Sequence, residues 1–334
     1  MNQDDFNYLL VLPHLKVHNA NAVSSPLTHG FPSITAFLGL MWALERKIRA
    51  TGIKLAFNAV GVVCHDHQER VSEGAFVKTF QLTRNPLQLD SDTKWIDKNG
   101  KTSSPAIVEE GRIHLDLSLV LAVYAETWDQ EAQQHDLKII TDLLRGSRIA
   151  GGSLLPTDLA RTSRYRPWIA DFTGNSDARS KKFRELCNRL LPGFALVARD
   201  DLIEKRLGDL RKQSPQASRL DAWLSLSRIN WHYDVKANDG NGGWQSDRKK
   251  GSGWVVPIPV GYGALSELLD AGSVANARDA TIPFRFVESL YSMGEWIGPH
   301  RLHAPQDLLW YADSHPDEGL YRCRNDYRTT DTTL

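Results

Sequence analysis

The residues best able to carry chemistry are a short run of metal-ligating types and a single histidine in a polar loop. The run Cys64-His65-Asp66-His67 would place both imidazoles on one face of a strand, where they could hold a metal ion. A zinc site needs three or four protein ligands, and the sequence does not identify the others. We prefer the interpretation that the run ends a strand, and we predict no metal and no cofactor.

His29 is the second candidate, because it could act as the general base of an RNA cleavage beside Ser24 or Ser25. The other interpretation, which we prefer, is a polar binding loop in which no proton moves. The sequence lacks the motifs GxxxxGK(S/T), GxGxxG, GxSxG and HExxH, so nucleotide hydrolysis, dinucleotide chemistry and zinc proteolysis are poorly supported. We predict no catalytic residue and keep an RNA-processing endonuclease that uses His29 as the alternative.

Amide and hydroxyl side chains gather in the loop that precedes an expected helix. Free backbone N–H groups at the start of a helix attract anions, and polar side chains can read the edges of unpaired bases. A turn that merely caps the helix is an equally open interpretation. The candidate RNA-binding residues of this loop are Asn19, Asn21, Ser24, Ser25, His29, Gly30, Phe31 and Ser33.

Cations and glycines farther along the chain extend this candidate interface. Two polar residues lie at the start of an expected hairpin and one arginine lies at its end. A glycine pair farther on permits close approach of a ligand to the backbone. Arginines that alternate with Tyr165 and Trp168 are typical of a surface for phosphates and stacked bases, although a solvated loop has the same composition. The candidates for RNA contact here are Arg84, Asn85, Arg112, Gly151, Gly152, Arg164 and Arg166.

The composition of the 334 residues is that of an ordinary globular protein, with 41% hydrophobic and 24% charged residues. Three cysteines lie far apart without a CxxC pair, which argues against a disulfide framework and favours reduced thiols in a cytoplasmic protein. No apolar stretch approaches the roughly 20 residues that a membrane helix needs. We therefore expect no membrane partner.

The formal net charge is zero, from 40 basic and 40 acidic side chains, but the charge is unevenly distributed. Residues 1–160 carry −3, residues 161–212 carry +6 and residues 213–334 carry −3. The basic segment could face phosphates, because Lys and Arg dominate the affinity of proteins for nucleic acids. A solvated helix surface is the competing interpretation.

The elements that must position these residues follow a β-α-β-β-α-β order over residues 7–155. Apolar spacing predicts a helix over 34–49, capped by Ser33, and a second helix over 127–144. This order is the ferredoxin-like (RRM-type) pattern, so we predict an α+β fold with such a palm. A β-hairpin "thumb" is expected to protrude over about residues 82–110, with Asn99-Gly100 at its turn.

We expect three segments along the chain. Residues 1–156 would form the palm with its thumb, and residues 157–232 a basic helical insertion or second subdomain. Residues 233–334 would begin with a mobile loop over 236–253, which is rich in glycine and charge, and would then complete the fold.

Eight blocks of the sequence resemble one known family in order along the chain. They are HNANAVSSPLTHGFPSITAFLG, QLTRNPL, AIVEEGRIHLDLSL, RIAGGSLLP, LLPGFALV, GWVVPIPVGYGALS, RFVESLYSMGEW and DLLWY followed by GLYR. The family is the subunit of the type I-F CRISPR surveillance (Csy) complex that holds the 5′ handle of the guide RNA. The resemblance runs from about Tyr8 to Arg324.

This resemblance implies a non-catalytic, RNA-binding RAMP-type protein that works in antiviral defence. Its partners would be the guide RNA, the large subunit of the complex and the repeated backbone subunit, with target DNA nearby in the assembly. By the same likeness, the loop from Asn19 to Ser33 and the segment from Leu82 to Pro86 would lie beside the handle.

Overall fold

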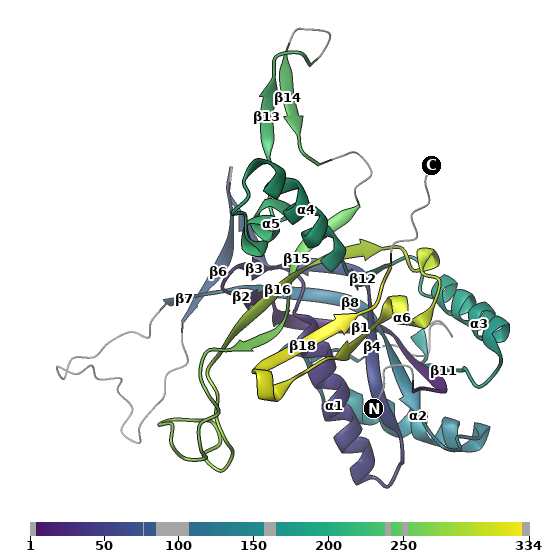
Figure 1. Ribbon diagram of the computed structural model, residues 1–334. Coiled ribbons are helices and arrows are strands. Elements are labelled where there is room, and N and C mark those ends of the chain that lie inside the picture. The colour runs from purple at the N-terminus through teal and green to yellow at the C-terminus, as the bar shows by residue number, and fades with distance from the viewer. Residues whose placement is uncertain are drawn as a thin grey trace.

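The protein has an α+β fold built on one large antiparallel sheet, as a computed structural model shows (Figure 1). The structure describes residues 5–75, 77–84, 107–156, 165–237, 242–248 and 253–328. The α+β class predicted from the sequence is confirmed. Asn85, Arg164 and the expected thumb tip lie outside the described residues.

Two halves of the chain contribute strands to this sheet. The first half forms β1 (Tyr8–Asn21), β2 (Val23–Ser25), β3 (Thr28–His29), α1 (Ile34–Ala50), β4 (Ala56–Glu69), β5 (Val71–Glu73), β6 (Lys78–Arg84), β7 (Ile107–Glu110), β8 (Arg112–Tyr124), α2 (Gln130–Arg145), β9 (Arg148–Ile149) and β10 (Gly152–Leu154). The second half forms β11 (Trp168–Asp171), α3 (Ser176–Arg189), β12 (Phe194–Ala198), α4 (Asp200–Gln213), α5 (Arg219–Leu226), β13 (Trp231–Asp234), β14 (Gly243–Ser246), β15 (Trp254–Ala264), β16 (Val287–Ile297), α6 (Pro305–Leu308), β17 (Leu309–Ala312) and β18 (Leu320–Asn325), with short 3-10 helices at Pro299–Arg301 and Pro316–Glu318.

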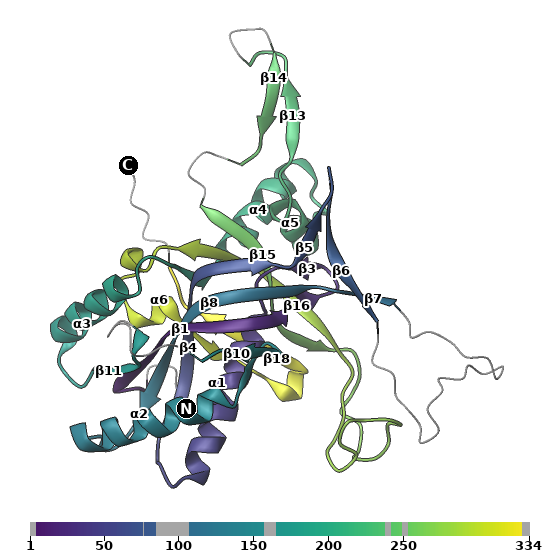
Figure 2. The same ribbon diagram turned by 180° about the vertical axis from the view of Figure 1, so that it is seen from behind.

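The strands of the main sheet follow the order β12-β16-β15-β18-β17-β4-β8-β1-β10-β9, and β11 also pairs with β1. The long strands β4, β8 and β1 lie side by side at its centre (Figure 2). Because β12 pairs with β4 as well as with β16, the six strands from β12 to β4 close into a ring. Residues 157–232, expected to be a helical insertion, thus supply β11 and β12 to the sheet as well as three helices.

Both faces of the central strands are covered, which explains why β1 begins with a continuous apolar run. Leu10 and Leu12 point to one face, where they pack in a core with α1 and α2. Leu9 and Val11 point to the opposite face, where they pack with α3. Side chains alternate between the faces of a strand, so a strand buried on both sides must be apolar at every position. Later in β1 the second face becomes polar, with His18 exposed.

The start and the end of α1 follow from single residues, and the Ser33 cap was predicted from the sequence. The Ser33 side chain accepts a hydrogen bond from the Thr35 backbone N–H at 3.3 Å and so caps the helix. Gly52 follows the last turn with a φ of +90°, a conformation that glycine adopts without steric cost.

The base of the predicted thumb is an antiparallel pair. β6 pairs with β7, from Gln81 opposite Glu110 to Arg84 opposite Ile107. β5 pairs with the start of β6 and completes a small sheet that leaves the main sheet beside β8 (Figure 2).

The prediction of a loop throughout residues 236–253 is wrong for Gly243–Ser246, which form β14 and pair with β13. Tyr233 lies directly opposite Trp244, and their ring centroids are 5.8 Å apart in an edge-to-face arrangement. Such cross-strand aromatic pairs stabilise a hairpin, and they outweigh the glycine-rich composition of the connecting segment.

The three cysteines are free and buried, as expected for a chain without a disulfide framework. Burial raises the pKa of the Cys64, Cys187 and Cys323 thiols to about 12. Among the helices of the described residues, none is long and apolar enough to cross a membrane.

Candidate nucleic-acid interface

A groove of about 440 Å³ opens where the β6–β7 hairpin leaves the sheet. We call it the basic groove, and it lies between β6, the end of β1 and the β9–β10 pair that hydrogen-bonds to β1. Three residues predicted from the sequence meet in it, together with three that were not. Its principal lining residues are Asn19, Arg112 and Gly151, which were predicted, and His18, Arg70 and Arg148, which were not.

Three arginines give this groove its charge. Arg70 donates a hydrogen bond to Asn19 Oδ1 at 3.0 Å, so the cation and the predicted amide form one unit. Arg112 pairs with Glu110 at 3.1 Å, the one carboxylate among the described lining residues. Arg148 is exposed and makes no ion pair or side-chain hydrogen bond within the described part of the chain. The groove therefore carries a surplus of positive charge, which suits phosphate.

Two histidine rings form a flat platform beside the arginines. His18 on β1 and His114 on β8 stack with ring centroids 3.9 Å apart and an interplanar angle of 17°. The backbone N–H of Asn19 donates to His114 Nδ1 at 3.2 Å, so this nitrogen carries no proton. Desolvation, and then the charges of His18 and Arg70, lower the pKa of His114. A pair of stacked aromatic rings on the open face of a sheet can stack with an unpaired base.

The lowered pKa of His114 has a measurable consequence for stability. The folded protein binds a proton at His114 less readily than the unfolded chain, whose histidine pKa is about 6.5. Its stabilising contribution is thus fully present above that pH and is lost as the pH falls below it. We expect the free energy of unfolding to fall more between pH 7.5 and pH 5.5 in the wild type than in His114→Gln, measured by urea denaturation. An equally steep fall in the variant would contradict this assignment.

A glycine pair holds Arg148 against the central sheet. Gly151 has a φ of +77° in the turn between β9 and β10. A Cβ at Gly152 would lie 2.7 Å from the backbone nitrogen of Ala20, so only glycine allows β10 to come this close to β1. The glycine pair was predicted to let a ligand approach the backbone. In the structure it lets β10 approach the backbone of β1, and it affects a ligand through the position of Arg148.

The end of the predicted loop lines a different groove. His29, Gly30 and Phe31 face a cavity of about 770 Å³ between the edge of β4 and β15. Among the charged residues of the described lining, Asp66, Glu69 and Glu73 are acidic and Lys78 is the one Lys or Arg, paired with Glu73 at 2.8 Å. We call this the acidic groove. Its charge disfavours phosphate, so the loop does not form one continuous phosphate surface with the basic groove.

The polar side chains in the middle of the loop bond within it. Asn21 closes a short turn with Val23 through hydrogen bonds of 2.8 Å and 3.1 Å. The buried Ser25 hydroxyl pairs with Thr28 Oγ1 at 2.7 Å and also accepts from the Thr28 backbone N–H. Ser24 donates to the Phe31 carbonyl at 3.3 Å. For these residues, the turn-and-cap interpretation describes the contacts that the structure contains.

The hydrogen-bond partner of the His29 ring within the described residues is a carboxylate. Its Nδ1 lies 3.0 Å from Glu69 Oε1, and its ring meets the edge of Phe80. The Ser24 and Ser25 hydroxyls bond inside the loop, as described above. Within the described residues, the hydrogen bonds of Ser24, Ser25 and His29 thus do not form the serine–histidine arrangement considered from the sequence.

The prediction that the Cys64–His67 run ends a strand is wrong in detail, because the run lies within β4, which continues to Glu69 and stays paired with β8. His65 Nε2 lies 2.6 Å from the Ser118 hydroxyl, and Nδ1 lies 2.6 Å from the Pro192 carbonyl. Its ring also stacks on His14 with centroids 4.1 Å apart. Within the described residues, no group of three or more His, Cys, Asp or Glu side chains is placed to hold a metal ion.

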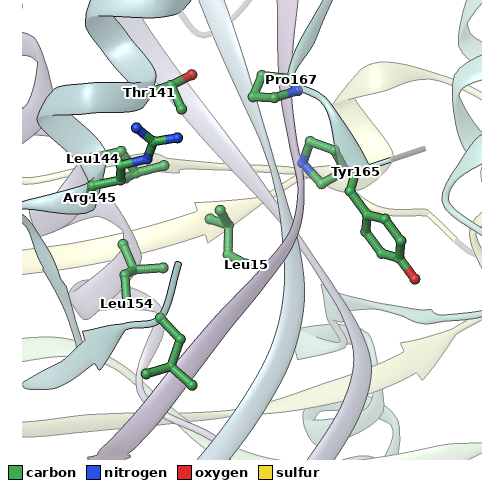
Figure 3. Close-up of a pocket in the computed structure, with 9 residues that line it drawn as sticks. Leu15, Thr141, Leu144, Arg145, Leu154, Tyr165 and Pro167 are labelled. Carbon is green, nitrogen blue, oxygen red and sulfur yellow. The ribbon is translucent and has the colours of Figure 1, made fainter. Parts of the chain in front are cut away.

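The two remaining predicted cations that the structure describes do not line either groove. Arg84 is exposed at the end of β6, and Arg166 is exposed just before β11. The segment that carries Arg166 is held against β1, because Tyr165 and Pro167 border a small, mainly apolar cavity of about 40 Å³ together with Leu15 (Figure 3). This cavity is too narrow for a nucleotide. The apolar side chains that line it hold the segment in place.

Sequence reasoning missed two of the three arginines of the basic groove for a definable reason. Arg70 follows directly after β4, and Arg148 begins β9, so neither belongs to a motif. The histidine platform did leave a signal, since His18 and His114 occupy polar positions in strands that alternate with apolar residues. A search for aromatic rings at the polar positions of the two central strands would have found it.

Fold and groove together define an α+β protein with a cationic groove and a stacked histidine pair beside a β-hairpin. The sequence profile of the family described as CRISPR-associated protein (Cas_Csy2) matches residues 10–323. The chain is 43% identical over 329 residues to the CRISPR-associated protein Csy2 of Pseudomonas aeruginosa (strain UCBPP-PA14), with 96% of each chain covered. The protein belongs to this family, which confirms the resemblance to the type I-F Csy-complex subunit.

Proposed function

We propose that this chain is the non-catalytic subunit that binds the 5′ handle of the guide RNA in the type I-F CRISPR surveillance complex, in the cytoplasm. The basic groove is the observation that carries the proposal, because Arg70, Arg112 and Arg148 converge there beside a histidine platform. Arginines would neutralise handle phosphates, and the His18–His114 pair would stack with a splayed base. Asn19 would be positioned by Arg70 to contact a base or sugar edge.

We infer that β1, α1, β4, β8, α2 and β10 form a ferredoxin-like palm. The four strands lie in the order β4-β8-β1-β10, which is second, third, first and fourth along the chain. α1 and α2 pack against one face of these strands, which leaves the histidine platform on the other. In this scheme residues 1–156 are the palm and its thumb, residues 157–232 the helical insertion and residues 233–334 the part that completes the fold.

The proposal assigns two protein partners, with target DNA nearby in the assembled complex. The large subunit would pair with this chain around the handle, and the repeated backbone subunit would begin its filament beside the thumb. Target recognition would then come from base pairing with the guide, since in RNA-guided complexes the protein binds the guide mainly through its backbone.

Salt dependence of handle binding tests the proposal directly. Three arginine–phosphate contacts to single-stranded RNA predict a slope of about −2 when log K is plotted against log salt concentration, from about −0.7 per contact. The measurement uses the full chain with its partner subunits and synthetic handle RNA in filter-binding assays. A slope near zero would contradict phosphate binding in the basic groove.

The same RNA distinguishes the endonuclease alternative. We expect repeat RNA to remain intact on incubation with the protein, because His29 faces the acidic groove, whose carboxylates repel an RNA phosphate. Cleavage that disappears in His29→Ala would overturn the non-catalytic assignment.

A further inference from the structure

The β13–β14 hairpin presents three aromatic rings to solvent. Trp231 is 59% exposed, Tyr233 54% and Trp244 67%. The hairpin projects beyond α4 and α5, away from the main sheet and from the β6–β7 hairpin (Figure 1). Single exposed apolar residues are common on protein surfaces, but adjacent exposed aromatic rings mark interaction sites.

All three rings lie on one face of the hairpin. Tyr233 is directly opposite Trp244, and Trp231 is two residues from Tyr233 on the same strand, so their side chains share a face. The other face carries His232 opposite Gln245. The hairpin is therefore sided, with an aromatic face and a polar face.

The aromatic face is held in place before any partner binds. Asp247, just after β14, accepts hydrogen bonds from Arg206 of α4 at 3.0 Å and from Asn230 at 2.6 Å. Arg248 donates to the Leu226 carbonyl at the end of α5 at 3.0 Å. A two-stranded hairpin is marginally stable alone, so these contacts fix its direction relative to the body. Rigid rings lose little entropy on binding.

The helices beneath the hairpin are themselves fixed to the main sheet. Trp223 of α5 is buried, and its Nε1 donates to the Ser292 carbonyl of β16 at 3.0 Å. Ile203 and Leu207 of α4 pack in the same core with Met293. The hairpin thus stands on a rigid support that is continuous with the main sheet.

The surroundings of the rings favour a protein partner over a nucleic acid. The exposed aliphatic side chains Ile229 and Val235 flank β13, one before and one after the strand. Among the described strand residues that share this face, none is a cation, whereas a base-stacking surface interleaves its rings with Lys or Arg. Cations lie instead beneath the hairpin, near α4 and α5. Arg228 and Lys205 form no ion pair there within the described residues.

We propose that the aromatic face of the β13–β14 hairpin inserts into an apolar pocket of a protein subunit whose rim is acidic. Trp231 and Trp244 would be the buried anchors, and Arg228 would meet carboxylates at the rim. The surface is separate from the basic groove, which none of these residues line. The inference therefore stands independently of handle binding.

Site-specific photo-crosslinking identifies what touches the rings. A benzophenone side chain is placed at position 244 in the full chain and irradiated in the assembled complex with RNA present. We expect a crosslink to a protein subunit other than a second copy of this chain. The matched control places the same group at Gln245, on the polar face of the hairpin, where we expect at least a fivefold lower yield. A crosslink to RNA, a crosslink to a second copy, or equal yields at both positions would overturn the proposal.

A double substitution measures the contribution of the anchors. We expect Trp231→Ser/Trp244→Ser to weaken association with the crosslinked subunit by at least about thirtyfold, because buried tryptophans dominate interface affinity. Handle RNA affinity of the variant should stay within twofold of the wild type, which separates this surface from the proposed function. Trp231→Phe/Trp244→Phe should recover most of the binding. Unchanged association of the serine variant would count against the proposal.

Discussion

Arg148→Glu is expected to lower the affinity for handle RNA by about 100-fold at physiological salt. Arg148 lines the basic groove, is exposed and forms no ion pair within the described residues, so its full charge is available to a phosphate. A hydrogen bond to a charged group contributes about 1.5–3 kcal/mol, and the new carboxylate would add repulsion of the same phosphate. Since about 1.4 kcal/mol corresponds to a factor of ten, the two effects together give roughly two orders of magnitude.

Arg145→Glu supplies a control with the same change in net charge. Arg145 is also exposed, only three residues earlier in the chain, but it lies at the end of α2, pairs with Asp142 and borders the small cavity of Figure 3 instead of the basic groove. We expect less than a threefold loss in filter-binding assays with this variant. If both variants lose affinity equally, Arg148 contributes only through the net charge of the protein and does not contact the handle. Circular dichroism checks that both remain folded.

The parts of the fold that local chemistry determines could be predicted from the sequence. The α1 helix begins after the Ser33 cap and ends before Gly52 because these residues satisfy its terminal backbone groups locally. The closed ring of strands could not be predicted, since β12 meets β4 across more than a hundred residues and only tertiary packing selects that pairing. β14 was missed because its stability comes from a cross-strand partner, Tyr233, and not from its own composition.

The candidate site was predicted only in part, because it also depends on contacts between residues that are far apart in the sequence. The loop from Asn19 to Ser33 was treated as one surface because its polar residues are neighbours in sequence. In the structure the β2–β3 turn folds it back, with the Gly30 N–H bonding to the Ala22 carbonyl at 2.8 Å. Asn19 consequently lines the basic groove, while His29 lies in the acidic one. Arg70 joins Asn19 from 51 residues away, which no local pattern indicates.

Trp310→Ala is expected to lower the free energy of unfolding by about 3–5 kcal/mol, the range for removing a fully buried large aromatic side chain. Trp310 is 0% exposed in β17, and its Nε1 donates to the Leu196 carbonyl of β12 at 2.8 Å. The substitution removes ring contacts and also leaves this buried carbonyl without its donor. Trp310→Phe should cost less, because it keeps most of the apolar volume. Trp231→Ala, on the exposed hairpin, should change stability by less than about 0.5 kcal/mol.

This substitution also tests whether the three proposed segments unfold separately. The ring of strands to which Trp310 belongs takes β4 from the first segment, β12 from the second and β17 from the third, so loss of the tryptophan should weaken all three together. Each segment carries one buried cysteine whose high pKa keeps it unreactive while folded, namely Cys64, Cys187 and Cys323. We expect thiol labelling of the three cysteines in increasing urea to show one shared midpoint, shifted to lower urea by Trp310→Ala. A midpoint for Cys187 that separates from the other two would mean that residues 157–232 form an independent unit, in spite of the strand that they lend to the ring.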